Sequence, residues 1–180
     1  QVDPGFQHRK PAVRILVDLY RGPRHHHGFA LFGEGVRLEL LAVGAPAGTV
    51  AVQFETPLRL RHHGRWVSER ALTPRHLAEA ALLRLSRVSA LYSSDALRLD
   101  WPSLQAAATS ARVAECTLHW HRAVRHSRRH SEAMQLDGVL GQLVLDGVPQ
   151  ELGRLFALGA VLHLGSKTTH GYGQFTLSSA

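Results

Sequence analysis

Ten residues near the end of the chain combine glycine, hydroxyl and cationic side chains in one short segment. From Gly165 to Gln174 the sequence is Gly-Ser-Lys-Thr-Thr-His-Gly-Tyr-Gly-Gln. Glycines allow close approach of a backbone, while serine, threonine and lysine side chains offer hydrogen bonds and positive charge to phosphate oxygens. The segment therefore predicts a polyanion-binding loop. Its expected contact residues are Gly165, Ser166, Lys167, Thr168, Thr169, Gly171 and Gly173.

The same segment does not match a nucleotide-binding P-loop. That motif requires glycine, four arbitrary residues, glycine, lysine and then serine or threonine, and it follows a strand. Here the order differs and the segment follows a predicted helix. An ordinary glycine-rich connection remains the alternative interpretation.

A second group of cationic side chains lies between two predicted strands. Four arginines fall within eight residues, and no carboxylate lies among them. Charges so close repel one another, and guanidinium groups bind phosphate oxygens through paired hydrogen bonds. We therefore expect a basic hairpin tip that contacts a nucleic acid backbone, with a solvated run of charges as the alternative. The four arginines are Arg122, Arg125, Arg128 and Arg129.

The composition supports an anionic partner. The 180-residue chain has a net charge of +7, and all its cationic residues except Lys10 and Lys167 are arginine. Such a composition is also typical of GC-rich genomes. Cys116 is the single cysteine, which excludes a disulfide framework within the chain and an all-cysteine metal site. No apolar run approaches the roughly 20 residues of a membrane span, so we expect a cytoplasmic protein with no membrane partner.

Apolar periodicity predicts alternating strands and helices after residue 49. Thr73 followed by Pro74 is typical of a helix start, and the residues from Val50 alternate as in a strand with one buried face. The expected elements are a strand over 50–61, a helix over 74–91, a loop with a short helical piece over 93–110, strands over 113–120 and 134–145 with a bulge at 137–138, a helix over 149–165, and a last strand containing Phe175 and Leu177.

This order of elements predicts an α+β fold. Strand, helix, strand, strand, helix, strand is the ferredoxin-like βαββαβ arrangement, with two helices on one face of a four-stranded antiparallel sheet. Residues 1–49 contain two more predicted strands, at 12–20 and 36–43, without a helix between them. We predict a partial N-terminal ferredoxin-like unit over 1–49 and a C-terminal ferredoxin-like domain over 50–180.

Four segments resemble, in order, those of the RAMP superfamily of CRISPR-associated proteins, especially the endoribonucleases that cut precursor CRISPR RNA. The segment 162–173, Leu-His-Leu-Gly-Ser-Lys-Thr-Thr-His-Gly-Tyr-Gly, resembles the family's glycine-rich signature. The segment 54–60 resembles the strand that opens its C-terminal domain, 125–129 its basic hairpin, and 134–141 the strand that follows. The resemblance covers about residues 29–177, and the first unit looks incomplete beside the family's pair of ferredoxin-like units.

The resemblance implies metal-independent cleavage of precursor CRISPR RNA. The ribose 2′-hydroxyl attacks the adjacent phosphate, which needs proton carriers and cations but no cofactor and no metal. The base usually comes from the first unit, so the catalytic candidates are His26 there and His170 in the glycine-rich loop. Arg59 and Arg61 join the loop and hairpin residues as expected RNA contacts. The implied partners are CRISPR repeat RNA and other CRISPR effector subunits.

Less specific interpretations remain for the histidines and for the function. His25–His27 fit a solvated turn, and His119 and His121 fit a polar sheet face better than a metal site, because no cysteine or carboxylate accompanies them at ligand spacing. A non-catalytic RAMP subunit that holds CRISPR RNA in an effector complex is the first alternative function. A ferredoxin-like domain for a small ligand or metal is the second.

Overall fold

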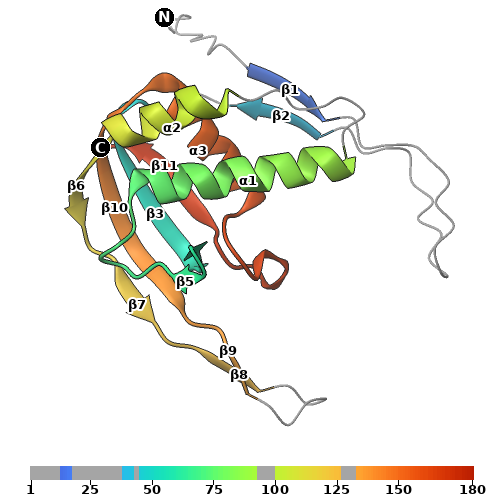
Figure 1. Cartoon of the computed structure of the whole chain (residues 1–180), viewed down its shortest axis with the longest axis vertical. Helices are drawn as coiled ribbons and strands as arrows, with labels where there is room; N and C mark the ends of the chain where they lie inside the picture. Colours follow the sequence, from blue (N-terminus) through green and yellow to red (C-terminus); the bar gives the residue numbers. More distant parts are fainter. Residues whose placement is uncertain (1–12, 18–37, 43–44, 93–99, 127–132) are drawn as a thin grey trace, which may run out of the picture.

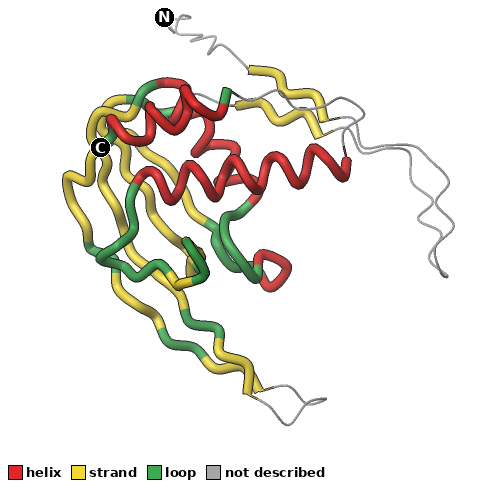
Figure 2. The backbone as a smooth tube through the Cα atoms, in the orientation of Figure 1, coloured by secondary structure: helices red, strands yellow, loops and turns green. Residues whose placement is uncertain are grey.

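Two strands that are distant in the sequence form the centre of the main sheet. These are β3 (Gly48–Leu58) and β10 (Gly138–Val148), which pair antiparallel with Val52 opposite Leu143. The computed structural model describes residues 13–17, 38–42, 45–92, 100–126 and 133–180, which are drawn in colour in Figures 1 and 2. Alternate residues of β3 are fully buried, so the predicted strand with one buried face is confirmed.

The main sheet has the strand order β11-β3-β10-β6, and all its pairs are antiparallel. β11 (Phe175–Ser179) borders β3, with Phe175 opposite Phe54. β6 (Arg112–Cys116) and β7 (His119–His121) both pair with β10 on its other side. The first and second strands of the unit are thus separated by the third, as in a split βαβ arrangement.

Three helices complete the unit: α1 (Pro74–Tyr92), α2 (Trp101–Ser110) and α3 (Gln150–Leu162). They lie over one face of the sheet, and α1 and α3 pack against each other (Figure 1). The core between the layers joins residues such as Phe54, Leu82, Leu143 and Phe156, each at most 1 % exposed. The predicted α+β ferredoxin-like class is confirmed, with insertions in its element order.

The insertions lie between β3 and β6. A small hairpin of β4 (Arg61–His62) and β5 (Arg65–Trp66) follows β3, which ends at Leu58 rather than at the predicted Arg61. The short helical piece expected within 93–110 is the ten-residue helix α2. Asp100 begins this helix, since its carboxylate accepts a hydrogen bond of 3.1 Å from the Ser103 N–H.

Two further predicted boundaries were wrong. The single strand expected over 113–120 is divided into β6 and β7, which are separated by residues 117–118, and all five residues of the edge strand β6 are exposed. The helix expected to reach Gly165 ends at Leu162, because His163 adopts φ +57° and leaves the helical region. The interruption expected at 137–138 separates β9 (Ala133–Gln135) from β10.

The two strands expected near the N-terminus are present. β1 (Val13–Val17) and β2 (Leu38–Ala42) form an antiparallel pair, and β2 lies beside α3. The division into two units at residue 49 stays a prediction. Within the described residues, no helix has the length and apolar character needed to cross a bilayer.

Candidate nucleic-acid interface

The glycine-rich loop folds back onto the end of β3. Its two ends are joined by a 3.0 Å hydrogen bond from Leu164 N–H to the Gly173 carbonyl. Gly173 N–H donates to the Pro57 carbonyl at 3.1 Å, and Ser166 N–H donates to the Arg59 carbonyl at 2.9 Å. Both ends of the loop are therefore fixed to the segment that follows the central strand.

Two glycines make this attachment possible. Gly165 (φ +83°) and Gly173 (φ +75°) have left-handed backbones. A Cβ on Gly165 would overlap the Arg59 carbonyl, and a Cβ on Gly173 would overlap the Leu164 carbonyl. The predicted close backbone approach thus occurs at these glycines, and the backbone that approaches is the protein's own.

The tip of the loop presents polar and cationic side chains to solvent. Lys167 adopts φ +67°, and residues 168–170 form a short 3-10 turn closed by a 2.9 Å bond from His170 N–H to the Lys167 carbonyl. Ser166, Lys167, Thr169 and His170 are exposed. The loop therefore has the donors and charge that phosphate binding requires.

The side chain of Tyr172 connects the loop to the stem of the predicted basic hairpin. The Tyr172 hydroxyl donates a 2.7 Å hydrogen bond to the Leu136 carbonyl, and Leu136 N–H donates to the Ala123 carbonyl at 2.8 Å. Burial raises the pKa of Tyr172 above its usual value; Arg59 partly opposes this increase, and the Asp137 carboxylate adds a smaller one. The phenol therefore stays protonated as a donor.

The hairpin stem is described, while its tip lies outside the described residues. β8 (Val124–His126) pairs with β9, and both extend away from the sheet (Figure 1). Arg122 is exposed at the base of the stem. Only the backbone of Arg125 is described, and Arg128 and Arg129 lie outside, as does the catalytic candidate His26. The structure therefore brings Arg122 and the loop residues into one region.

Trp66 of the small hairpin contacts Arg59 and Arg61, two of the residues that were expected to bind RNA. The guanidinium carbons of Arg59 and Arg61 each lie 4.2 Å from the centre of the Trp66 ring. Such cation–π contacts orient both side chains before any ligand binds.

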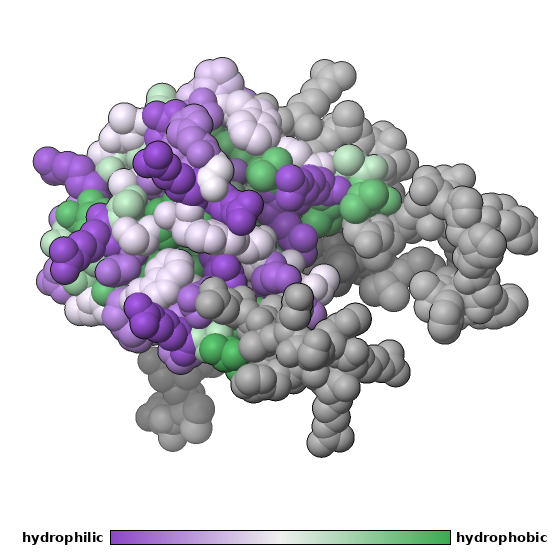
Figure 3. Space-filling model, turned by 60° about the horizontal axis from the view of Figure 1, so that its bottom comes forward, coloured by the Kyte–Doolittle hydropathy of each residue, from purple (hydrophilic) through white to green (hydrophobic). Residues whose placement is uncertain are grey.

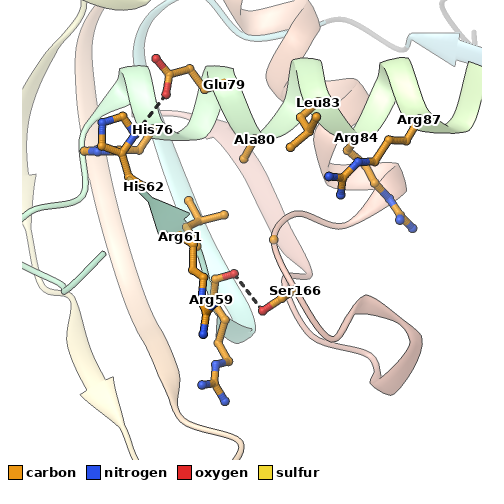
Figure 4. A pocket seen from close by; sticks show the side chains of 12 residues that line it. Arg59, Arg61, His62, His76, Glu79, Ala80, Leu83, Arg84, Arg87 and Ser166 are labelled. Carbon is orange, nitrogen blue, oxygen red and sulfur yellow. Dashed lines mark hydrogen bonds and ion pairs between the residues drawn. The ribbon is translucent and has the colours of Figure 1, made fainter. Parts of the chain in front are cut away.

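Beside these arginines lies a groove of about 450 Å³. It runs between α1, the segment 59–62 and the first residues of the glycine-rich loop (Figure 4). Arg84 and Arg87 line it from α1, and Arg87 is exposed to solvent. Arg84 is half-buried, and its Nε donates to the Leu162 carbonyl at 3.2 Å.

Two histidines and a carboxylate occupy one end of the groove. His62 Nδ1 lies 3.4 Å from Glu79 Oε2, and the His62 and His76 rings meet edge to face with centres 4.7 Å apart. Burial is the main cause that lowers the pKa of His76 below 6.5; His62 and Arg75 lower it further, and Glu79 opposes them. His76 is therefore neutral at pH 7. Within the residues described, neither these three side chains nor any other group of three histidine, cysteine or carboxylate side chains is arranged to hold a metal ion.

Comparison with known families gives one match. The model of the CRISPR-associated endoribonuclease Cas6 family matches residues 52–175 of the chain. That range contains most of β3, the hairpin stem and the glycine-rich loop. No protein with a curated description matches the chain.

Several solved structures share the fold. Cas6 from Thermus thermophilus has 23% identity and a TM-score of 0.56, over 74% of this chain and 55% of that one. A Cas6 product complex has 23% identity and a TM-score of 0.50, over 77% and 54%. A Cas6-RT-Cas1–Cas2 complex has 17% identity and a TM-score of 0.53, over 75% and 14%. The chain spans about half the length of the first two.

The surroundings of the two glycines predict that substitution by alanine destabilises the protein less at Gly171 than at Gly173. Gly171 and Gly173 both have a positive φ, but only Gly173 has a backbone atom where a Cβ would lie. We expect Gly171→Ala to lower the free energy of unfolding by about 1 kcal/mol through backbone strain alone, and Gly173→Ala to lower it by at least about 3 kcal/mol. Urea denaturation of both variants measures the difference, and equal costs would contradict the described loop.

The histidine pair predicts a specific pH dependence. Because the pKa of folded His76 is lowered, the unfolded chain binds the proton more tightly, and this group's contribution to stability is lost as the pH falls below 6.5. The free energy of unfolding of His76→Gln should therefore decline less than that of the wild type over this window.

In an NMR titration, His62→Gln should raise the pKa of His76 without restoring 6.5, since burial remains. An unchanged pKa would contradict the ring contact.

Proposed function

The chain belongs to the Cas6 family of CRISPR-associated endoribonucleases, and we propose that it binds CRISPR repeat RNA and cleaves precursor CRISPR RNA. The observation that carries this proposal is the Tyr172–Leu136 hydrogen bond, which joins the glycine-rich loop to the stem of the basic hairpin. A stem-loop RNA placed there meets Arg122 on one side and Lys167 on the other. Both are exposed cations, which suits backbone contacts to RNA.

The RNA contacts follow from the character of each part of this surface. The hairpin arginines Arg125, Arg128 and Arg129 extend the positive charge along the RNA. Ser166, Thr168 and Thr169 offer hydroxyl donors to phosphate oxygens. In Figure 3, hydrophilic side chains cover much of the visible face, with small apolar areas between them.

The proposed cleavage uses the RNA's own nucleophile. A base removes the proton of the 2′-hydroxyl, the oxygen attacks the adjacent phosphorus, and an acid protonates the leaving 5′-oxygen. The products are a 2′,3′-cyclic phosphate and a 5′-hydroxyl. We assign the proton transfers to His26 and His170, and the stabilisation of phosphate charge to Lys167. The step requires no metal ion.

The wider context of the activity belongs to the same proposal. Residues 1–49 form part of a first ferredoxin-like unit that supplies His26, and residues 50–180 form the C-terminal domain. One similar solved structure is a Cas6 product complex and another contains Cas6, RT, Cas1 and Cas2. By analogy, the partners of this chain are repeat RNA and other CRISPR proteins, and it acts in the cytoplasm.

The mechanism predicts cleavage in the presence of a chelator. We expect the purified chain, incubated with repeat RNA and EDTA, to yield a 2′,3′-cyclic phosphate end. Since positioned proton carriers contribute about 10²–10⁴-fold, His26→Ala and His170→Ala should each lower the single-turnover rate by at least about a hundredfold. Product ends are read by mass spectrometry.

Other outcomes of the assay have distinct meanings. Full activity in both histidine variants would remove the catalytic assignments and leave RNA cleavage in place. RNA that is bound but never cut would favour the non-catalytic CRISPR RNA-binding subunit. Cleavage that stops in EDTA and returns with a divalent cation would contradict the metal-independent mechanism.

The hairpin predicts a salt-dependent contribution to RNA affinity. Arg128→Ala/Arg129→Ala should weaken RNA binding and reduce the slope of log K against log salt by about 2, roughly one per lost phosphate contact. A matched control is Arg112→Ala/Arg154→Ala, which removes the same charge from exposed positions on β6 and α3. Equal effects of both double variants would contradict a specific hairpin contact and favour a small-ligand domain.

A further inference from the structure

The groove beside α1 has an apolar floor and cationic sides. Leu60, Ala80 and Leu83 line its floor, and 46% of the surface of Leu83 is exposed. Arg59 and Arg61 line one side, where they lie against Trp66, and Arg84 and Arg87 line the side formed by α1 (Figure 4).

The charges of the groove are unbalanced. Its lining contains four arginines and one carboxylate, that of Glu79. Glu79 is already engaged, because Arg75 Nε lies 2.8 Å from its Oε1 and His62 Nδ1 lies 3.4 Å from its Oε2. The groove therefore keeps a positive potential that favours an anionic occupant.

We propose that this groove binds a single-stranded segment of the RNA that flanks the stem held at the loop and hairpin, an inference that rests on the proposed function. The arginines on the two sides bind consecutive phosphates, and the exposed Leu83 contacts a base. A volume of about 450 Å³ is that of a small-ligand pocket. It admits one or two nucleotides and excludes a double helix.

Continuity with the glycine-rich loop favours RNA over an acidic peptide. Gly165 and Ser166 line the groove and also begin the loop, and both the Ser166 N–H and its hydroxyl are directed to the Arg59 carbonyl, at 2.9 and 3.3 Å. A strand leaving the loop therefore enters the groove without crossing another element. The planar guanidinium groups fit phosphate oxygens through paired hydrogen bonds, and an apolar floor between cations suits the alternation of base and phosphate.

The test compares two charge reversals at exposed arginines. Arg87→Glu changes the groove, and Arg154→Glu makes the same change of charge on α3, outside the groove. Binding of a fluorescein-labelled ten-residue oligouridylate to the full chain is followed by anisotropy. We expect Arg87→Glu to weaken this binding by roughly tenfold, the value of one charge-assisted hydrogen bond, and Arg154→Glu by less than about twofold. Matching thermal unfolding of the three proteins verifies their folding.

Each result decides a separate point. Equal affinities of the two charge variants for oligouridylate, with the wild type still binding repeat RNA, would overturn this inference and leave the proposed function intact. No binding of either RNA to the wild type would overturn both. Displacement of oligouridylate by polyglutamate at equal charge would assign the groove to an acidic protein instead and overturn the inference.

A second variant tests contact with a base. Leu83→Ser should weaken binding of oligouridylate severalfold and leave binding of an abasic ribose-phosphate oligomer unchanged, because only the former has a base to lie on the floor. An equal loss for both oligomers would show that the groove binds phosphate alone, and would overturn the assignment of Leu83.

Discussion

The fold of the site depends on one constraint, which is the contact of the glycine-rich loop with the backbone at the end of β3. Gly165 and Gly173 allow this contact because a side chain at either position would overlap a carbonyl. β3 is a central strand of the sheet, so the loop is attached to one of the most rigid elements of the domain. Its attachment also sets the position of Tyr172, whose hydroxyl reaches the stem of the hairpin.

Two cationic regions meet at this attachment. On one side, the loop tip and the base of the hairpin present Lys167 and Arg122. On the other side, the side chain of Arg59 lines the groove, while its backbone carbonyl accepts the hydrogen bond from the Ser166 N–H. The chain has a net charge of +7, and part of this excess positive charge lies on these two adjoining surfaces. Such an arrangement suits an RNA that has a stem and a single-stranded flank.

Local patterns in the sequence predicted the elements best where one periodicity dominated. The alternation in β3 was confirmed because it reflects a single buried face, and the Thr73-Pro74 start of α1 because helix capping depends on local residues. A strand was predicted where β6 lies, but its full exposure was not, because exposure depends on its place at the sheet edge, which alternation does not encode. α2 was underestimated although Asp100, Pro102 and Ser103 form a good N-terminal cap. The groove could not be predicted, because Arg84 and Arg59 come together only when α1 packs over the strand end.

The central claim is that the glycine-rich loop and the hairpin stem form one RNA-binding surface, and cross-linking tests it most directly. A repeat RNA carrying a single 4-thiouridine beside the base of its stem is bound to the full chain, irradiated, and the attached peptides are identified by mass spectrometry. The account predicts cross-links to peptides from 163–174 and from 119–126 or 133–140 with the same labelled nucleotide. Efficient cross-links confined to one of these two regions, or to neither, would contradict it.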